Sequence, residues 1–443
     1  MIDSGASPDT LPVRAWTGAL AGTALPDGGA EQIDEIRALE ELVCAAQARQ
    51  TRLAAAFDVA ERARQRAAGV AAAQQGRGVA EQIALARRES PHRGRQHLSL
   101  AKVAHELPHA MEAFRRGLAT EWRITTLARE TACLSLEDRL AVDRAVAGDP
   151  EGFSGYSDRS VFAEVRKLVA RLDPAAVAER RRRAEAERRV TIRPAPDTMV
   201  HLTALLPVAQ GVAVHAALTA EADRLRAAGD PRGRHQVMAD TLVTRATGAP
   251  APDGRPVVPV SVGLVMTDRA LLAGAHDDTA LVDHGPIPGD LARSLVLHAV
   301  EAGTRTWVRR LYRHPESGEL VAMDSRQRRF PHQLATFLRY RDQWCRHPWC
   351  GAPIRHADHV VPVSEEGDTT ADGGQGLCES CNYAKQAPGW RQQPRPGPAG
   401  HGRHAVDLTT PTGHRHRSTA PPLLGPRQPA FRQVEPGRWV LIA

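Results

Sequence analysis

Four of the six cysteines in this 443-residue chain fall in two short pairs toward its C-terminal end. Cys345 and Cys350 form a C-x4-C pair, and Cys378 and Cys381 form a C-x2-C pair, with 27 residues between the two pairs. Zinc takes four thiolates at the corners of a tetrahedron, and two short loops can each present two of them. Residues 1–26 lack a basic region followed by an apolar block, so we expect a cytoplasmic protein with reduced thiols. The spacing therefore predicts a structural zinc site rather than disulfides.

Two alternatives to a four-cysteine staple stay open. His347, inside the first loop, could replace one thiolate, and the cluster could belong to a zinc ribbon that only folds or binds. Pro348 and Gly351 supply the tight backbone that this loop needs. Cys44 and Cys133 stand alone in helical patterns, and we expect them to be small buried residues.

The segment between and after the cysteine pairs carries a specific motif. It reads RHADHVVP over residues 355–362 and LCESCNYAK over residues 377–385. This resembles the HNH endonuclease family, whose ββα-metal core runs D-H-[IV]-x-P, then a Gly-rich loop, then L-C-x-x-C-[NH]-x-x-K. The resemblance covers about residues 340–390. Six residues fall in register with the four cysteines: Asp358, His359, Pro362, Leu377, Asn382 and Lys385.

The resemblance implies that His359 is a general base and that Asp358 and Asn382 hold one catalytic divalent ion, Mg²⁺ or another. A neutral histidine, with an ordinary pKa of about 6.5, can take a proton from water at neutral pH. A hard divalent ion prefers oxygen ligands and stabilises charge on a phosphate. Because adjacent strand residues point to opposite faces, Asp358 and His359 can serve one site only if the strand ends or bends there. Pro362, just beyond, is consistent with such an end.

One position departs from the family pattern. Members usually carry an Asn five residues before the third cysteine, in a stretch like A-N-G-Q-G-L-C, and this Asn braces the loop. Here residues 372–378 read DGGQGLC, with Gly373 at the Asn position. We therefore expect a less rigid loop unless Asp372 substitutes, although the proposed base and metal ligands are kept.

Five further residues near the motif each have more than one interpretation. His356 could bind a metal, orient a phosphate, or be an ordinary strand residue. Lys385 could contact a phosphate or neutralise the surface of its helix. Arg339, Arg341 and Arg346 could contact a nucleic-acid backbone or be ordinary solvated residues.

The elements around this motif follow from the hydrophobic periodicity. Apolar residues at helical spacing predict helices over most of residues 30–172, with breaks at Pro108 and Gly117. A further helix over 331–344 leads into the cysteine cluster. The pattern between them is mixed: it predicts helices at 207–228, 236–247 and 290–302 and strands at 198–206, 257–266, 280–282, 305–313 and 319–323.

We therefore predict a multidomain α+β protein with five parts. They are a disordered leader (1–28), a mainly helical domain (29–190), a mixed α/β region (191–330), the zinc-stapled ββα-metal module (331–390) and a flexible basic Pro/Arg-rich tail (391–443). Within the tail, only a hairpin around Thr412–Gly413 is expected.

A wider resemblance covers roughly residues 30–425. The stretches LSLAKVAHELPHAMEAFRRG (98–117), LPVAQGV (206–212) and TPTG (410–413) are similar to those of the actinobacterial 13E12-repeat proteins. In that group a domain of unknown function 222 precedes a C-terminal HNH module. This resemblance implies the architecture and a nuclease activity, but no substrate.

The charge distribution suits a polyanionic partner. The formal net charge is +7, and residues 391–443 contribute +6, from eight arginines against Asp407 and Glu435. A basic segment beside a catalytic module favours nucleic acid, although the arginines could merely keep a Pro-rich tail soluble. The arginines of residues 179–189 alternate with glutamates and predict a solvated helix rather than a DNA contact. No apolar run reaches 18 residues, so no membrane span is expected.

Three functions compete on these observations. The intact Asp358, His359 and Asn382 set favours a metal-dependent endonuclease acting on nucleic acid, with DNA preferred over RNA. Gly373 supports the alternative of a nucleic-acid-binding zinc module without cleavage activity. A structural or interaction protein, in which zinc is only a folding staple, is the third. Strandedness, cleavage sequence and oligomeric state stay open.

Overall fold

The computed structural model describes residues 11–155, 157–247, 264–266, 268–272, 279–281, 285–301, 330, 332–395, 403–421, 430–435 and 438–442. The chain divides into two compact units. Met1–Pro174 and Arg310–Ala443 form the first, and Ala175–Arg309 form the second. This division falls before residue 190, where the sequence pattern places the end of the helical domain.

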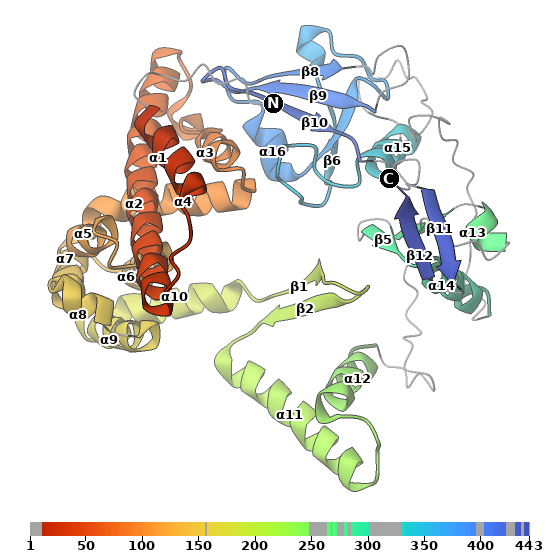
Figure 1. Cartoon of the computed structure of the whole chain (residues 1–443), viewed down its shortest axis with the longest axis horizontal. Coiled ribbons are helices and arrows are strands. Elements are labelled where there is room, and N and C mark those ends of the chain that lie inside the picture. The colour runs from red at the N-terminus through yellow and green to blue at the C-terminus, as the bar shows by residue number, and fades with distance from the viewer. Residues whose placement is uncertain are drawn as a thin grey trace. The chain divides into compact units, whose positions relative to one another are not determined.

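The N-terminal part of the first unit is helical, as predicted (Figure 1). Its α-helices are α1 (Leu11–Gly22), α2 (Gly29–Ala67), α3 (Val79–Arg87), α4 (Pro91–Val103), α5 (Pro108–Arg115), α6 (Glu121–Thr131), α7 (Leu136–Ala147), α8 (Pro150–Gly155) and α9 (Asp158–Leu172). The side chains of Ser90, Thr120, Ser135 and Ser157 cap four of these helices by accepting hydrogen bonds from backbone N–H groups. The predicted break at Pro108 is confirmed, because α5 begins there.

The predicted leader differs from the structure over α1. Leu11–Gly22 form a helix of 12 residues, where a disordered segment was expected. Pro12 lies in the first turn, where its missing N–H removes no intrahelical hydrogen bond, and no other proline interrupts the segment. Gly18 and the preceding Gly, Ser and Asp residues are poor helix formers, so the sequence pattern does not predict this helix.

The second unit is mixed α and β. Its helices are α10 (Pro174–Ala186), α11 (Val208–Ala227), α12 (Arg234–Thr247), α13 (Asp268–Leu272) and α14 (Gly289–Glu301), and its strands are β1 (Arg189–Pro194), β2 (Val200–Leu205), β3 (Leu264–Val265), β4 (Thr279–Leu281) and β5 (Gly285–Ile287). β1 and β2 pair antiparallel, and β3, β4 and β5 form a second small sheet. Of the predicted strand 257–266 only the last residues are described, and the strands predicted at 305–313 and 319–323 lie outside the described residues.

The arginine-rich segment forms a solvated helix with internal ion pairs, as predicted. In α10, Arg182 and Arg183 both pair with Glu179, and Arg181 pairs with Glu185. These pairs join residues three or four apart on one exposed helix. The helix therefore neutralises much of its own charge.

The C-terminal part of the first unit contains the motif residues. α15 (His332–Asp342) leads into the cysteine loop, β6 (His356–His359) pairs antiparallel with β7 (Gly374–Leu377), and α16 (Glu379–Ala384) follows. In the register, His356 lies opposite Leu377 and His359 lies opposite Gly374. A short 3-10 helix, η4 (Val363–Glu365), lies between the two strands in the sequence. This β6–β7–α16 arrangement is the ββα unit that the sequence predicts.

Part of the predicted flexible tail is instead a sheet. β8 (Arg391–Arg395), β9 (Ala405–Thr409) and β10 (Arg415–Thr419) form three antiparallel strands in the order β10-β9-β8. Val406 and Leu408 of the central strand are buried, and Pro394 lies on an edge strand, where a missing N–H is tolerated. The predicted hairpin is confirmed, with Gly413 at φ +83° in its turn. β11 (Ala430–Glu435) and β12 (Arg438–Ile442) form a further pair.

The C-terminal sheet and the segment after α16 pack against α3 within the first unit. Leu85, Ala387, Trp390 and Leu408 form one buried apolar cluster. Arg64 donates to the carbonyl of Pro388 (3.2 Å). Gly78, at φ +83°, has Trp390 so close that an added Cβ would clash with the indole. The helical and C-terminal segments therefore share a core, although some 300 residues separate them in the chain.

No helix among the described residues is both long enough and apolar enough to cross a membrane.

Candidate active site and metal cluster

The four predicted zinc ligands lie together. The Sγ atoms of Cys345, Cys350, Cys378 and Cys381 are all within 4.8 Å of one another. Cys350 Sγ is 3.7 Å from Cys378 Sγ and 3.6 Å from Cys381 Sγ. A tetrahedral zinc with Zn–S bonds of about 2.3 Å requires S–S separations of about 3.8 Å, whereas a disulfide requires about 2.05 Å. The cluster is therefore consistent with a structural zinc and with four unpaired thiols.

The two cysteine pairs come from different local structures. Cys345 and Cys350 belong to a tight loop in which Trp349 and Gly351 have φ near +58°. Cys378 is the N-cap of α16, and the backbone N–H of Cys381 donates to its sulfur (3.5 Å). Hydrogen bonds among the four thiols lower the pKa of Cys378, Cys345 first, and raise that of Cys381.

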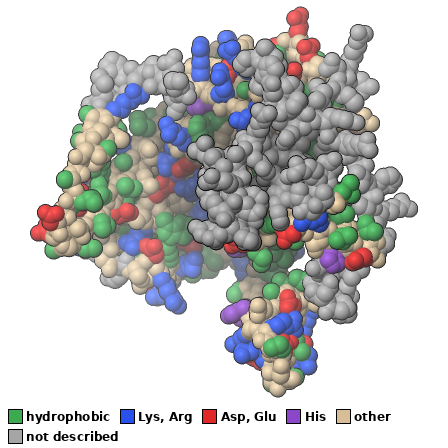
Figure 2. All heavy atoms as spheres, turned by 45° about the vertical axis from the view of Figure 1, so that its right-hand side comes forward, with side chains coloured by type: hydrophobic (Ala, Val, Ile, Leu, Met, Phe, Trp, Pro, Cys, Tyr) green, Lys and Arg blue, Asp and Glu red, His purple; other side chains and the backbone are tan. Residues whose placement is uncertain are grey.

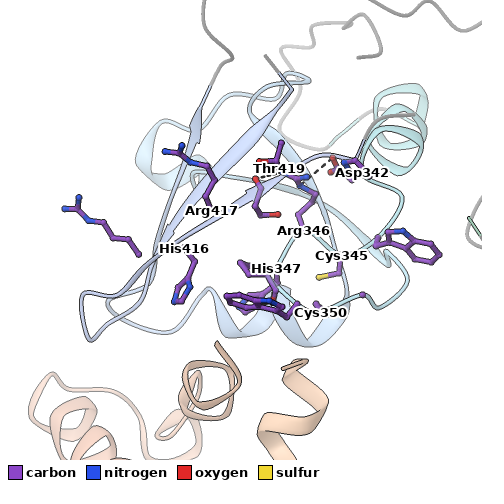
Figure 3. A pocket seen from close by; sticks show the side chains of 15 residues that line it. Asp342, Cys345, Arg346, His347, Cys350, His416, Arg417 and Thr419 are labelled. Carbon is purple, nitrogen blue, oxygen red and sulfur yellow. Dashed lines mark hydrogen bonds and ion pairs between the residues drawn. The ribbon is translucent and has the colours of Figure 1, made fainter. Parts of the chain in front are cut away.

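His347 is not a member of the cluster. Its ring is buried beside Trp390, with the ring centroids 6.0 Å apart, and burial lowers its pKa to about 4. Figure 3 shows it on the loop between Cys345 and Cys350, next to a cavity of about 540 Å³ that the loop shares with β10. The four cysteines complete a ligand set without it.

The remaining lone cysteines agree in part with the prediction. Cys44 is buried, and Cys133 is half-buried. Neither lies near the four-cysteine cluster as a fifth member.

Two polar pairs join β6 to α16. Lys385 Nζ forms an ion pair with Asp358 Oδ2 and also donates to the backbone carbonyl of His359. Asn382 Nδ2 lies 2.8 Å from His356 Nδ1. Burial lowers the pKa of Lys385, and the Asp358 carboxylate opposes that shift. The structure thus brings His356, Asp358, Asn382 and Lys385 together.

His359 lies at the end of β6, and its ring contacts other residues than His356, Asp358, Asn382 and Lys385. Its Nε2 is 2.8 Å from the hydroxyl of Thr369, and its ring centroid is 4.5 Å from that of Phe330. The residue is 8% exposed. Burial lowers its pKa, the Asp358 carboxylate raises it, and Lys385 lowers it, so these charges lie within electrostatic reach. β6 ends at His359, as a shared site with Asp358 requires.

The loop before Cys378 is braced without the family asparagine. Arg341 donates to the carbonyls of Ala371 and Gly374 (2.8 Å for the latter), on either side of Gly373. The Gly373 N–H donates to the Thr370 hydroxyl (2.8 Å). An added Cβ at Gly373 would clash with the carbonyl of Asp368, so a side chain at this position requires a different loop path.

Hydrogen bonds from other residues therefore compensate for the loss of rigidity expected at Gly373. The Asp372 side chain is exposed and does not substitute for the family asparagine. Its backbone carbonyl instead lies 2.9 Å from His404 Nε2. The bracing groups come from α15 and from the segment before β9.

Arg341 and Arg346 are buried, so the prediction that they contact solvent or a nucleic-acid backbone is wrong. Arg341 makes a two-point ion pair with Asp342 (2.7 and 3.0 Å), and both side chains are at most 3% exposed. Asp342 also accepts from the Gly376 N–H (2.7 Å). Arg346 lies 3.8 Å from the same carboxylate. This cluster fixes α15 to β7.

Replacing Arg341 with alanine is expected to destabilise the C-terminal module by about 3 kcal/mol. Removing one partner of a buried ion pair leaves the other charge uncompensated, which costs about 3–5 kcal/mol. Arg346 and the Gly376 N–H still face Asp342, so the lower end of that range applies. Urea unfolding measures the change. The exposed Arg339 of the same helix is the control, and an equal loss in Arg339→Ala would contradict the account.

The burial of His404 is expected to make the stability of the fold depend on pH. Burial lowers its pKa to about 4 in the folded state, while the unfolded chain protonates it at its usual pKa of about 6.5. The folded state binds fewer protons at this residue. The contribution of neutral His404 to the stability of the fold is therefore fully present above pH 6.5 and is lost as the pH falls toward 4. His404→Gln keeps an N–H for the Asp372 carbonyl and cannot take up the proton.

We therefore expect the free energy of unfolding of His404→Gln, relative to that of wild type, to rise by about 2 kcal/mol when the pH is lowered from 7.5 to 5. Urea unfolding at both pH values measures this difference, and any shared loss of metal at low pH cancels. The exposed His105 provides the control variant His105→Gln, which should show no such gain. A constant difference between His404→Gln and wild type at the two pH values would refute the assignment.

The fold and the cluster define the class of the C-terminal module, and the family comparison agrees. The model described as HNH endonuclease matches residues 345–387. The chain as a whole belongs to the family described as domain of unknown function (DUF222), whose model matches residues 37–342. A search of curated proteins and a search of solved structures gave no match.

Two residues at the site were not predicted from the sequence. Thr369, which holds His359, and Phe330, which packs on it, lie ten and 29 positions away. Neither belongs to a motif used for the prediction. Their proximity depends on how the loop and α15 return to β6.

Proposed function

We propose that this protein is a metal-dependent endonuclease that hydrolyses phosphodiester bonds in DNA, with His359 as the general base. The observation that carries this proposal is the position of His359 at the end of β6 in an HNH ββα unit, with one ring nitrogen bound to Thr369. A nuclease base needs a fixed ring with one nitrogen free to accept a proton.

The environment of His359 suits that role. When Nε2–H donates to the Thr369 hydroxyl, Nδ1 carries the lone pair that can accept a proton from water. Burial favours the neutral form, so the base is available at neutral pH. Lys385 holds the backbone carbonyl of the same residue and so limits movement of the strand end.

Asp358 and Asn382 have the donor types for a catalytic divalent ion. Asp358 offers a carboxylate, and the buried Oδ1 of Asn382 has no hydrogen-bond partner among the described residues. Such an ion, Mg²⁺ or a similar one, would polarise the scissile phosphate and stabilise the leaving oxygen. Lys385 already neutralises Asp358, so an ion must share this carboxylate with it or displace it.

We also propose that zinc occupies the four-cysteine cluster and positions Asn382. The ligand Cys381 directly precedes Asn382 on α16, and Cys378 caps the same helix. Fixing these two sulfurs fixes the start of the helix. His356, which contacts Asn382, then orients its amide rather than acting as a strand residue alone.

A nucleic-acid-binding zinc module without cleavage is the second candidate. The ion pair between Lys385 and Asp358 favours it, because a cation already satisfies the carboxylate. Under this reading the C-terminal module would bind DNA through its charge and would show no dependence on a divalent ion.

Nicking of supercoiled plasmid DNA tests the proposal. Zinc-loaded protein is freed of excess metal by dialysis, and cleavage is followed with and without added Mg²⁺ or Mn²⁺. We expect nicked circles only when a divalent ion is added, at constant zinc content. Binding of the plasmid without nicking under any of these conditions would favour the second candidate.

A further inference from the structure

The sheet β8–β10 is attached rigidly to the nuclease module although it lies beyond the matched HNH residues. Arg346 donates to the carbonyls of Ser418 (2.7 Å) and His404 (3.3 Å), and His404 reaches the active-site loop at Asp372. Gln375 of β7 donates to Gln392 of β8 (2.5 Å). The matched residues end at 387, so this sheet is an addition to the HNH unit.

One face of this sheet carries four exposed arginines, which we call the arginine face: Arg391, Arg395, Arg415 and Arg417. Successive strand residues point to opposite sides, so Gln392, Pro394 and His416 turn to the other side of the sheet. Figure 3 shows this alternation on β10, where His416 and Arg417 project to opposite sides of the strand. Figure 2 shows several Lys and Arg side chains close together at the top of the view.

A single carboxylate faces these four guanidinium groups from the central strand. Asp407 accepts hydrogen bonds from Arg417 and Arg395 (both 2.7 Å), which lower its pKa. Arg391 and Arg415 have no ion pair among the described residues. Both lie opposite Thr409 in the strand register, one on each side. Two strand spacings place their backbones about 10 Å apart.

The remaining side chains of this face are polar, which favours a nucleic acid over a protein as the partner. They are Gln393, Asp407, Thr409 and Thr419, with the small Ala405 as the one apolar exception, and the face presents no large apolar group of the kind found at the centre of protein interfaces. Guanidinium groups bind phosphate oxygens through two parallel hydrogen bonds. Four arginines against one aspartate leave an excess of three positive charges.

We propose that the arginine face binds the phosphate backbone of duplex DNA and holds it on the nuclease module. The inference rests on the proposed endonuclease function and extends it by naming the surface that supplies affinity. Contacts of this type position the protein without reading the base sequence. Arg391 and Arg415 supply the free charge, while Asp407 keeps Arg395 and Arg417 ordered.

The salt dependence of DNA binding tests this surface. The background is the His359→Ala protein, so that cleavage does not consume the probe, and the probe is a fluorescent duplex whose anisotropy is followed at several salt concentrations. We expect Arg391→Gln/Arg415→Gln to reduce the slope of log Kobs against log[salt] by about 1.8, or about 0.9 for each lost phosphate contact. The binding of this variant to duplexes of unrelated sequence should weaken equally.

A charge-matched variant controls for net charge. Arg49 and Arg52 are exposed on α2, and Arg49→Gln/Arg52→Gln removes the same two charges from another surface. Its slope should equal that of the parent. Arg391→Lys/Arg415→Lys should keep most of the parental slope, which separates loss of charge from a local change in folding.

The outcomes separate the surface from the nuclease activity. An unchanged slope in Arg391→Gln/Arg415→Gln, or an equal drop in the α2 control, overturns the arginine face even if wild type nicks plasmid. Failure of the parent to bind duplex DNA at all overturns it as well, and absence of nicking by wild type then removes the endonuclease proposal with it.

Discussion

Replacing Cys381 with serine is expected to unfold the C-terminal module and abolish cleavage. Structural zinc sites contribute apparent binding free energies of about 10–16 kcal/mol at pH 7, which equals or exceeds the whole stability of a typical domain. Cys381 is fully buried, and its sulfur lies 3.6 Å from that of Cys350. A hydroxyl is a poor replacement for a thiolate at such a site.

Zinc content and thermal unfolding measure this effect in the full-length protein. Cys381→Ser should retain far less than one zinc per chain and should lose the unfolding transition of the C-terminal module. Cys133→Ser, at a half-buried cysteine outside the cluster, is the matched control and should keep both. A Cys381→Ser protein that keeps its metal and its stability would show that the cluster is not a folding staple.

Local signals made the metal cluster and the motif predictable. The spacing of Cys345, Cys350, Cys378 and Cys381 depends on two short loops, and the order of Asp358, His359 and Asn382 depends on one strand and one helix. The helices of residues 29–172 were predictable for the same reason, because each shows its own apolar periodicity.

The C-terminal sheet could not be predicted in this way. β8 reads RQQPR and β10 reads RHRST, so neither strand contains an apolar residue other than Pro394. Their pairing depends on the apolar Val406 and Leu408 of β9, which are buried on one side of the sheet. Polar edge strands of this kind have the composition of a flexible tail.

Contacts between segments far apart in the chain also could not be predicted from the sequence. Trp390 packs on α3, and Arg64 reaches Pro388 from 324 positions away. By residue type alone we expect Arg341 at the surface, yet it is buried because Asp342 and two loop carbonyls surround it. Only the folded chain shows that this arginine replaces a brace at Gly373.

Replacing His359 with alanine is expected to lower the rate of DNA cleavage roughly 100- to 10,000-fold, the usual contribution of a positioned general base. The ring contacts Thr369 and Phe330 and takes no part in the four-cysteine cluster. The variant should therefore keep its zinc and bind DNA as wild type does. His105→Ala, at an exposed histidine of the helical segment, is the matched control and should cleave normally.

The most direct test of the account is the single-turnover rate of plasmid nicking by wild type and His359→Ala at equal zinc content, with Mg²⁺ or Mn²⁺ present. The account predicts nicking by wild type and a loss of at least about 100-fold in the variant, with DNA binding unchanged. Equal rates for the two proteins would contradict the assignment of His359 as the base.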